Sequence, residues 1–97
     1  MAEIRGDLYL PGQSARQAAV LEVDAHRHAS FRADDGSLLA EQDFDRLEIS
    51  PRLGDTPRII SLENDARFET RANDAVDRLL RRFGAQAGHR LLHRMER

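Results

Sequence analysis

Two pairs of histidines have a spacing that could serve a metal ion. His89 and His93 are four residues apart, which on a helix places both imidazoles on one face, as in the H-E-x-x-H helix of zinc proteases. That chemistry needs a glutamate directly after the first histidine, and Arg90 stands there instead. His26 and His28 could share one side of a strand, but a metal site needs three or four ligands. We therefore predict surface histidines at both places, with no metal and no other cofactor.

Three close pairs of carboxylates could in principle serve as general acid and base. Such catalysis requires one carboxyl group to be buried so that its pKa is raised. All six side chains fall in predicted turns or on polar faces of predicted strands, where we expect them to be solvated. The pairs are Glu22 with Asp24, Asp34 with Asp35, and Asp43 with Asp45. The sequence also has no cysteine, no phosphate loop and no G-x-S-x-G motif, so we expect a chain that is not an enzyme.

One proline-bracketed segment, residues 49–58, has the composition of a contact loop. Its two prolines flank a stretch with an exposed-looking leucine, a glycine and charged residues. Pro and Gly stiffen strand connections generally, so a plain connection is the simpler interpretation. The alternative is a loop that contacts a partner domain, since binding residues concentrate on loops. The candidate contact residues are Arg52, Leu53, Gly54, Asp55 and Arg58.

Short alternating segments predict the strands that would position these residues. Apolar and polar residues alternate at period two, and turn residues separate the segments. The Asp35-Gly36 step predicts a hairpin, because Gly readily adopts the positive φ that such turns need. The predicted strands lie at 7–10, 21–24, 28–32, 38–43, 46–50, 60–62 and 68–70. Seven short strands indicate a small antiparallel barrel or sandwich.

From residue 73 the pattern changes to that of a half-buried helix. Asn73 is the predicted N-cap, Gly84 the predicted stop, and Asp74–Arg78 and Asp77–Arg81 are predicted i,i+4 ion pairs. The apolar stripe consists of Val76, Leu79, Leu80 and Phe83. Its expected partners in the core are Leu21, Val23, Phe31, Ile49, Ile60 and Phe68.

Seven strands followed by one helix is the element order of a pleckstrin-homology-like (PH-like) barrel, in which the helix plugs the open end of a bent sheet. We therefore predict a mainly β (α+β) fold, a seven-stranded antiparallel barrel or roll at residues 1–84, capped by this helix. A two-layer sandwich with a helix is the alternative. An Arg-rich helical tail, residues 85–97, would follow.

The charge is unevenly distributed within this single small domain. The chain of 97 residues has a net charge of −2, with nine Arg and sixteen acidic residues in 1–77 but six Arg and one Glu in 78–97. An acidic body does not suit nucleic acid, whose phosphates require neutralisation, so we expect no nucleic-acid partner. The basic residues of the C-terminal part are Arg78, Arg81, Arg82, Arg90, Arg94 and Arg97.

Several segments resemble a known family. Residues 49–58 are similar to one half of a paired signature, and Phe68-Glu69-Thr70 with residues 73–77 to the other half. Residues 6–9, 35–36 and 91–96 fit the same pattern, so the resemblance spans nearly the whole chain. Together they resemble the N-terminal accessory domain of proteobacterial membrane-bound zinc metalloproteases of the HtpX-like family (metallopeptidase family forty-eight).

The resemblance implies that a membrane-spanning segment and an H-E-x-x-H protease domain would normally follow, which makes this chain an excised domain or a stand-alone copy. None of the family's zinc ligands has a matching position here. The Arg-rich C-terminal part would then be held on the cytoplasmic side and attracted to anionic lipid. We expect a non-catalytic cytoplasmic domain at the inner membrane, whose partner is the protease and transmembrane region of the parent chain or another protein.

Two other functions stay open at this point. The first is a free-standing PH-like module that binds a peptide or protein along a sheet edge. The second is a small metal-dependent enzyme that uses His26, His28 and nearby carboxylates.

Overall fold

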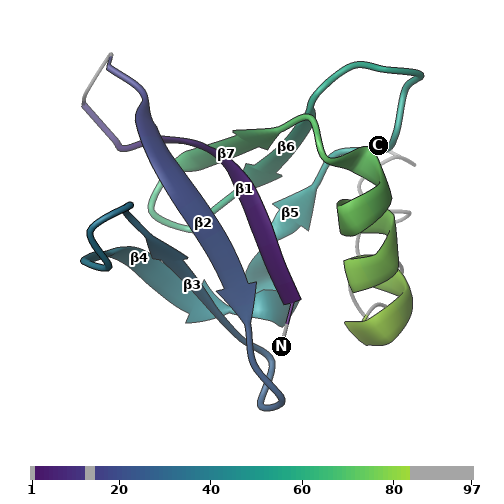
Figure 1. Cartoon of the computed structure of the whole chain (residues 1–97), viewed down its shortest axis with the longest axis horizontal. Coiled ribbons are helices and arrows are strands. Elements are labelled where there is room, and N and C mark those ends of the chain that lie inside the picture. Colours follow the sequence, from purple (N-terminus) through teal and green to yellow (C-terminus); the bar gives the residue numbers. More distant parts are fainter. Residues whose placement is uncertain (1, 13–14, 84–97) are drawn as a thin grey trace.

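The chain folds into one antiparallel sheet of seven strands followed by a helix (Figure 1). The computed structural model describes residues 2–12 and 15–83. The strands are β1 (Ala2–Tyr9), β2 (Gln17–Val23), β3 (His28–Arg32), β4 (Leu38–Asp43), β5 (Glu48–Ile49), β6 (Arg58–Ser61) and β7 (Arg67–Thr70). A 3₁₀ turn, η1 (Phe44–Arg46), which the sequence did not predict, joins β4 to β5. The mainly β prediction is confirmed.

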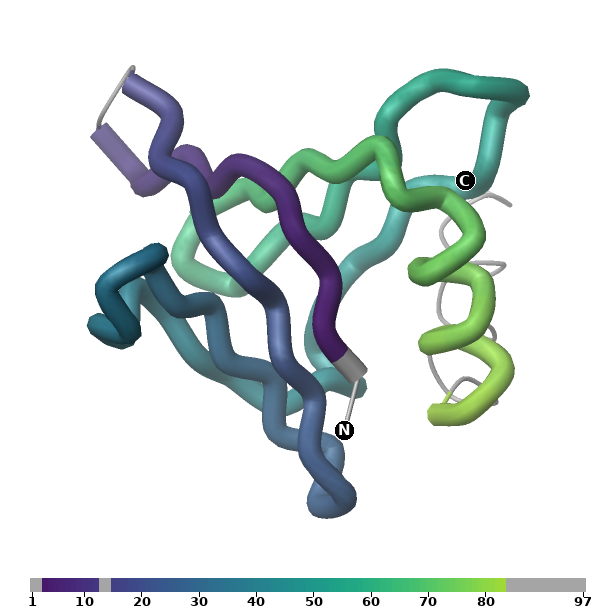
Figure 2. Tube along the Cα trace, in the orientation of Figure 1, coloured from purple at the N-terminus to yellow at the C-terminus, as the bar shows by residue number. Residues whose placement is uncertain are grey.

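The sheet is strongly curled, and its strand order explains how. The order is β4-β3-β2-β1-β7-β6-β5, so β1 pairs on one side with β2 and on the other with β7. Figure 2 shows the sheet bending around this central strand, with the helix standing alongside it. Because all seven strands belong to one curled sheet, a half-barrel describes the fold and a two-layer sandwich does not.

The core lies inside the curl and includes one face of the helix. Val76, Leu79 and Phe83 are buried together with apolar side chains of the strands, while Leu80 is half-buried. The strand residues expected in this core are all buried, namely Leu21, Val23, Phe31, Ile49, Ile60 and Phe68. The helix therefore covers the hydrophobic interior with the stripe that its 3.6-residue period predicts.

The first strand is longer than predicted, because a glycine interrupts its alternation. Ile4 and Leu8 are buried on one face of β1, and Gly6 occupies the position between them. A Cβ at Gly6 would lie 2.4 Å from the Glu69 carbonyl oxygen and 2.7 Å from Cζ of Phe68. The missing side chain thus lets β7 and its phenylalanine approach β1 closely.

The helix occupies residues 73–83 of the described chain, and it begins differently from the prediction. The carbonyl of Ala72 accepts the hydrogen bond from the Val76 amide, 3.1 Å, so Ala72 is the N-cap and Asn73 is the first helical residue. Just upstream, Thr70 Oγ1 accepts from the Ala72 amide, 3.1 Å, and donates to the Arg5 carbonyl, 2.7 Å. This hydroxyl ties the start of the helix to β1. The predicted stop at Gly84 and the predicted tail, with His89, Arg90, His93, Arg94 and Arg97, lie outside the described residues.

Candidate functional site at the junction of the loop and the helix

A buried ion pair joins β6 to the helix. Arg58, the first residue of β6, is 2% exposed, and its guanidinium donates to Asp77 Oδ1 at 2.8 Å and to the Ser50 carbonyl at 2.8 Å. The sequence suggested Arg58 as a contact for a partner. That prediction is wrong, because the guanidinium is enclosed and engaged within the fold.

A second arginine joins the loop to the same helix face. Arg52 donates to Asp74 Oδ1 at 2.9 Å and to Asp77 Oδ2 at 2.7 Å. The two arginines hold the pKa of Asp77 below its ordinary value, chiefly through the hydrogen bond from Arg58 and next through that from Arg52. The predicted i,i+4 pairs of the helix are therefore wrong: the carboxylates of Asp74 and Asp77 bind arginines from the loop and β6 instead.

A third contact fixes the far end of the loop. Asn73 Nδ2 donates to the Thr56 carbonyl at 3.1 Å. Thr56 in turn donates to the Leu53 carbonyl from both its amide, at 3.0 Å, and its hydroxyl, which closes a turn with Gly54 at φ 56°. Leu53 is left 68% exposed at the tip. The loop is thus a connection held against the helix that presents one apolar side chain to solvent.

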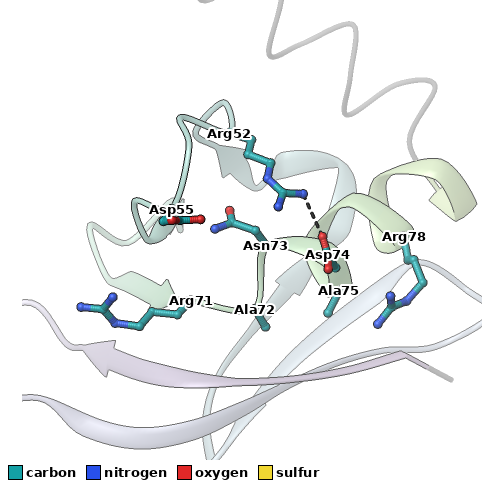
Figure 3. Close-up of a pocket in the computed structure, with 8 residues that line it drawn as sticks. All are labelled: Arg52, Asp55, Arg71, Ala72, Asn73, Asp74, Ala75 and Arg78. Atoms are coloured by element: carbon teal, nitrogen blue, oxygen red, sulfur yellow. Dashed lines mark hydrogen bonds and ion pairs between the residues drawn. The ribbon is translucent and has the colours of Figure 1, made fainter.

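A pocket of about 320 Å³ lies at this junction, in front of the first turn of the helix (Figure 3). Its lining combines side chains of both charges with the amide of Asn73. The lining residues are Arg52, Asp55, Arg71, Ala72, Asn73, Asp74, Ala75 and Arg78. Of the five predicted loop residues, Arg52 and Asp55 line this pocket, whereas Leu53 and Gly54 lie at the exposed tip and Arg58 lies in the interior.

The chemistry of the junction suits binding. Three arginines and two aspartates line the pocket, and the first amides of a helix have no partners within the helix and attract negative charge. Next to the pocket, the hydrogen bonds from Arg58 and Arg52 hold the pKa of Asp77 below its ordinary value, so this carboxylate stays ionised and keeps Arg52 engaged. Charged groups such as the arginines of the lining recognise a ligand by salt bridges and hydrogen bonds.

A separate arginine holds the last described turn of the helix. Arg27, in the turn between β2 and β3 at φ 64°, donates to Asp45 Oδ1 at 2.6 Å and also to the Phe83 carbonyl. Its guanidinium lies 5.9 Å from the ring centroid of Phe44 and 5.6 Å from that of Phe83. The hydrogen bond that Arg27 donates to the Asp45 carboxylate raises the pKa of Arg27. Nothing in the local pattern of the sequence singled out this residue.

His26 and His28, which were considered as metal ligands and predicted to be surface histidines, have different partners. His28 Nε2 lies 2.7 Å from Glu41 Oε1 on β4, and His26 lies in the turn, where its amide donates to Asp24 at 2.9 Å. Within residues 2–12 and 15–83, no group of three or more histidines and carboxylates could hold a metal ion.

The basic residues on the helix face solvent. Arg78, Arg81 and Arg82 are all exposed, and Arg82 lies over the ring of Phe83 with 5.4 Å to its centroid. In the part of the chain that the structure describes, no helix has the length and apolar character needed to cross a bilayer.

Comparison with known proteins identifies a family. Neither the curated proteins nor the solved structures yield a match. The family model described as a domain of unknown function (DUF7092) matches residues 3–83, which take in nearly all of β1, the other six strands and the helix as far as residue 83. The chain therefore belongs to the DUF7092 family.

Proposed function

We propose that this chain is a non-catalytic accessory domain of a membrane-bound zinc metalloprotease of the HtpX-like family. In that role it would lie on the cytoplasmic face of the inner membrane and dock to the protease, present its substrates or regulate it. The partner is then the protease and transmembrane region of a parent chain, or another protein bound in the same way.

The observation that carries the proposal is that the two halves of the resembling signature touch each other. Arg52 belongs to residues 49–58 and Asp74 to residues 73–77, and their side chains are 2.9 Å apart. Arg58 and Asp77, from the same two segments, form the buried pair at 2.8 Å. The residues on which the resemblance rests are thus one contiguous unit, and its exposed part, at Arg52 and Asp74, is the candidate docking face.

The exposed arginines of the helix add support for a membrane-facing orientation. Arg81 and Arg82 project to solvent on a helix that leads toward the Arg-rich residues 85–97. Basic residues close to an anionic bilayer each contribute on the order of 1 kcal/mol of attraction.

The coding sequence that follows residue 97 tests the parentage. We expect an apolar span of about 20 residues and then an H-E-x-x-H motif in the same reading frame. A stop codon there, with no such protease encoded alongside, contradicts the proposal.

Vesicle co-sedimentation tests the membrane orientation. The full chain should sediment with phosphatidylserine vesicles at low salt, and less so at high salt, since ionic attraction is screened. Removal of residues 85–97, or R81Q/R82Q, should reduce the bound fraction. The matched control R5Q/R46Q removes the same charge from exposed positions on β1 and η1 and should not. Equal binding by all of these proteins counts against this orientation.

A free-standing peptide-binding module is the second candidate, because β4 is an edge strand of six residues. Such an edge can accept an extended peptide as an additional strand. Peptide-induced shifts of the β4 amides in an NMR titration would favour this function.

A further inference from the structure

We propose that the pocket at the junction of the loop and the helix binds an acidic side chain of an extended peptide segment. The carboxylate would lie in front of the first turn of the helix, attracted by Arg71 and Arg78, and a backbone N–H of the same segment would donate to Asn73 Oδ1. This inference deepens the proposed function and rests on it for one point, that the partner is a protein segment.

The pocket has two cationic groups that the fold does not neutralise. Arg71 and Arg78 are exposed, and neither forms an ion pair within the described residues. Figure 3 shows them on opposite sides of the start of the helix. Arg52, in contrast, is engaged by Asp74 and Asp77. The two open guanidiniums and the positive end of the helix dipole favour an anionic group at this position.

The pocket also has an acceptor that requires a donor. Asn73 is 7% exposed, and its Oδ1 is buried without a hydrogen-bond partner within the described chain, although its Nδ2 is bonded to Thr56. Figure 3 shows this amide extending from the start of the helix into the space between Arg52 and Asp55. A buried acceptor without a partner is costly, so a ligand that supplies a donor here gains affinity.

The combination of charges distinguishes a peptide from a simple anion. Asp55 and Asp74 line the pocket beside Asn73, so a ligand meets acceptors as well as cations. The dianion of a phosphate monoester presents only acceptor oxygens, which these two carboxylates and the amide oxygen repel. An aspartate or glutamate within a peptide brings its own backbone N–H groups within a few ångströms of its carboxylate. An acidic peptide therefore complements both the arginines of the lining, through its carboxylate, and the acceptor groups of the lining, through its backbone N–H groups.

An NMR titration of the full chain tests the proposal. The probe is a capped tripeptide with aspartate at its centre, and the control probe has asparagine there. We expect the aspartate peptide to shift the backbone amides of Asp74 and Ala75 and those of residues 52–56, with the asparagine peptide giving little change. Equal shifts by both peptides overturn the proposal.

Variants and other anions complete the test. R71Q/R78Q should weaken the aspartate peptide roughly tenfold or more, while R81Q/R82Q, on the same helix but outside the pocket, should leave its affinity unchanged. Retained dispersion of the amide spectrum establishes that each variant is folded. If inorganic phosphate, acetate or phosphatidylserine vesicles shift the same amides with equal or greater affinity, the pocket takes any anion and the proposal is wrong. These results do not depend on what is encoded after residue 97, so this inference and the proposed function fail separately.

Discussion

The guanidinium of Arg58 lies 2.8 Å from Oδ1 of Asp77, although the two residues are 19 positions apart and Arg58 is only 2% exposed. Removing a charge from water is costly unless it is paired and hydrogen-bonded, and Arg58 has both this carboxylate and the Ser50 carbonyl. The pair therefore favours the rotational setting of the helix that brings Asp77 over β6. That setting also presents Asn73 and Asp74 to the loop.

Replacing Asp77 by asparagine should strongly destabilise the fold. The variant D77N leaves the buried guanidinium of Arg58 without a counter-charge, which typically costs about 3 kcal/mol or more in the free energy of unfolding. The matched control is D74N on the same helix, since the Asp74 side chain is 79% exposed and surface pairs contribute about 0.5 kcal/mol. Urea unfolding of both variants measures the difference, and equal losses would contradict a dominant role of the buried pair.

Acid should destabilise the chain through the same carboxylate. Arg58, and next Arg52, hold the pKa of Asp77 below its ordinary value in the folded chain. A group whose folded pKa lies below its unfolded pKa, about 3.9 for Asp, stabilises the fold fully above the unfolded pKa and loses this contribution as the pH falls through the folded pKa.

The urea midpoint, followed from about pH 6 to about pH 2.5, should therefore be flat above about pH 5 and fall below about pH 4. D77N should show a shallower fall, because it has no carboxylate to protonate at this position. Parallel curves for the two proteins would assign the acid sensitivity to other groups, such as Asp24 and Asp35, whose pKa values are also lowered.

The strands and the helix could be predicted because burial follows the period of each element. Residues 28–32 and 38–43 were assigned with the bounds of β3 and β4, and the Asp35-Gly36 hairpin between them has Gly36 at φ 89° as expected. The start of β1 escaped prediction, because at Gly6 the inward position is filled by the ring of Phe68 from another strand. The alternation of apolar and polar residues along the chain cannot show that a side chain from another strand fills this position.

The candidate site could be predicted only in part, because its bonds join distant segments. Local spacing indicated that Asp77 would pair with Arg81 along the helix, but Arg58 and Arg52 reach it from 19 and 25 positions away. Similarly, Asn73 had the residue type of an N-cap, yet its amide bonds the Thr56 carbonyl of the loop. The prolines and the glycine did identify the loop itself, since turn chemistry is local.

A methyl group at Gly6 should disturb the crossing of β1 and β7. In G6A the added Cβ meets a backbone oxygen at 2.4 Å, and overpacking of this kind costs about 3 kcal/mol when backbone must move. The control G36A has open space around its Cβ but a φ of 89°, so it should cost only about 1 kcal/mol of backbone strain. Thermal or urea unfolding that ranks the two variants in the opposite order would show that β1 and β7 can separate without loss.

A lysine in place of Arg27 should loosen only the last described turn of the helix. Arg27 bonds both carboxylate oxygens of Asp45 and the Phe83 carbonyl while it lies over two rings, and a lysine ammonium has no planar fork with which to do this. In R27K, amide hydrogen exchange should accelerate in the last described turn of the helix, near Phe83, and stay unchanged near Val76. The amide of Val76 lies in the turn held by Asn73 and Asp77, which Arg27 does not contact.

The control R46K changes an exposed arginine of η1 that pairs loosely with Glu63, at 3.6 Å, and should alter neither region. Uniform acceleration along the whole described helix in R27K would mean that the helix opens as a single unit. The expectation that Arg27 and the contacts of Asn73 and Asp77 hold the helix independently would then be wrong.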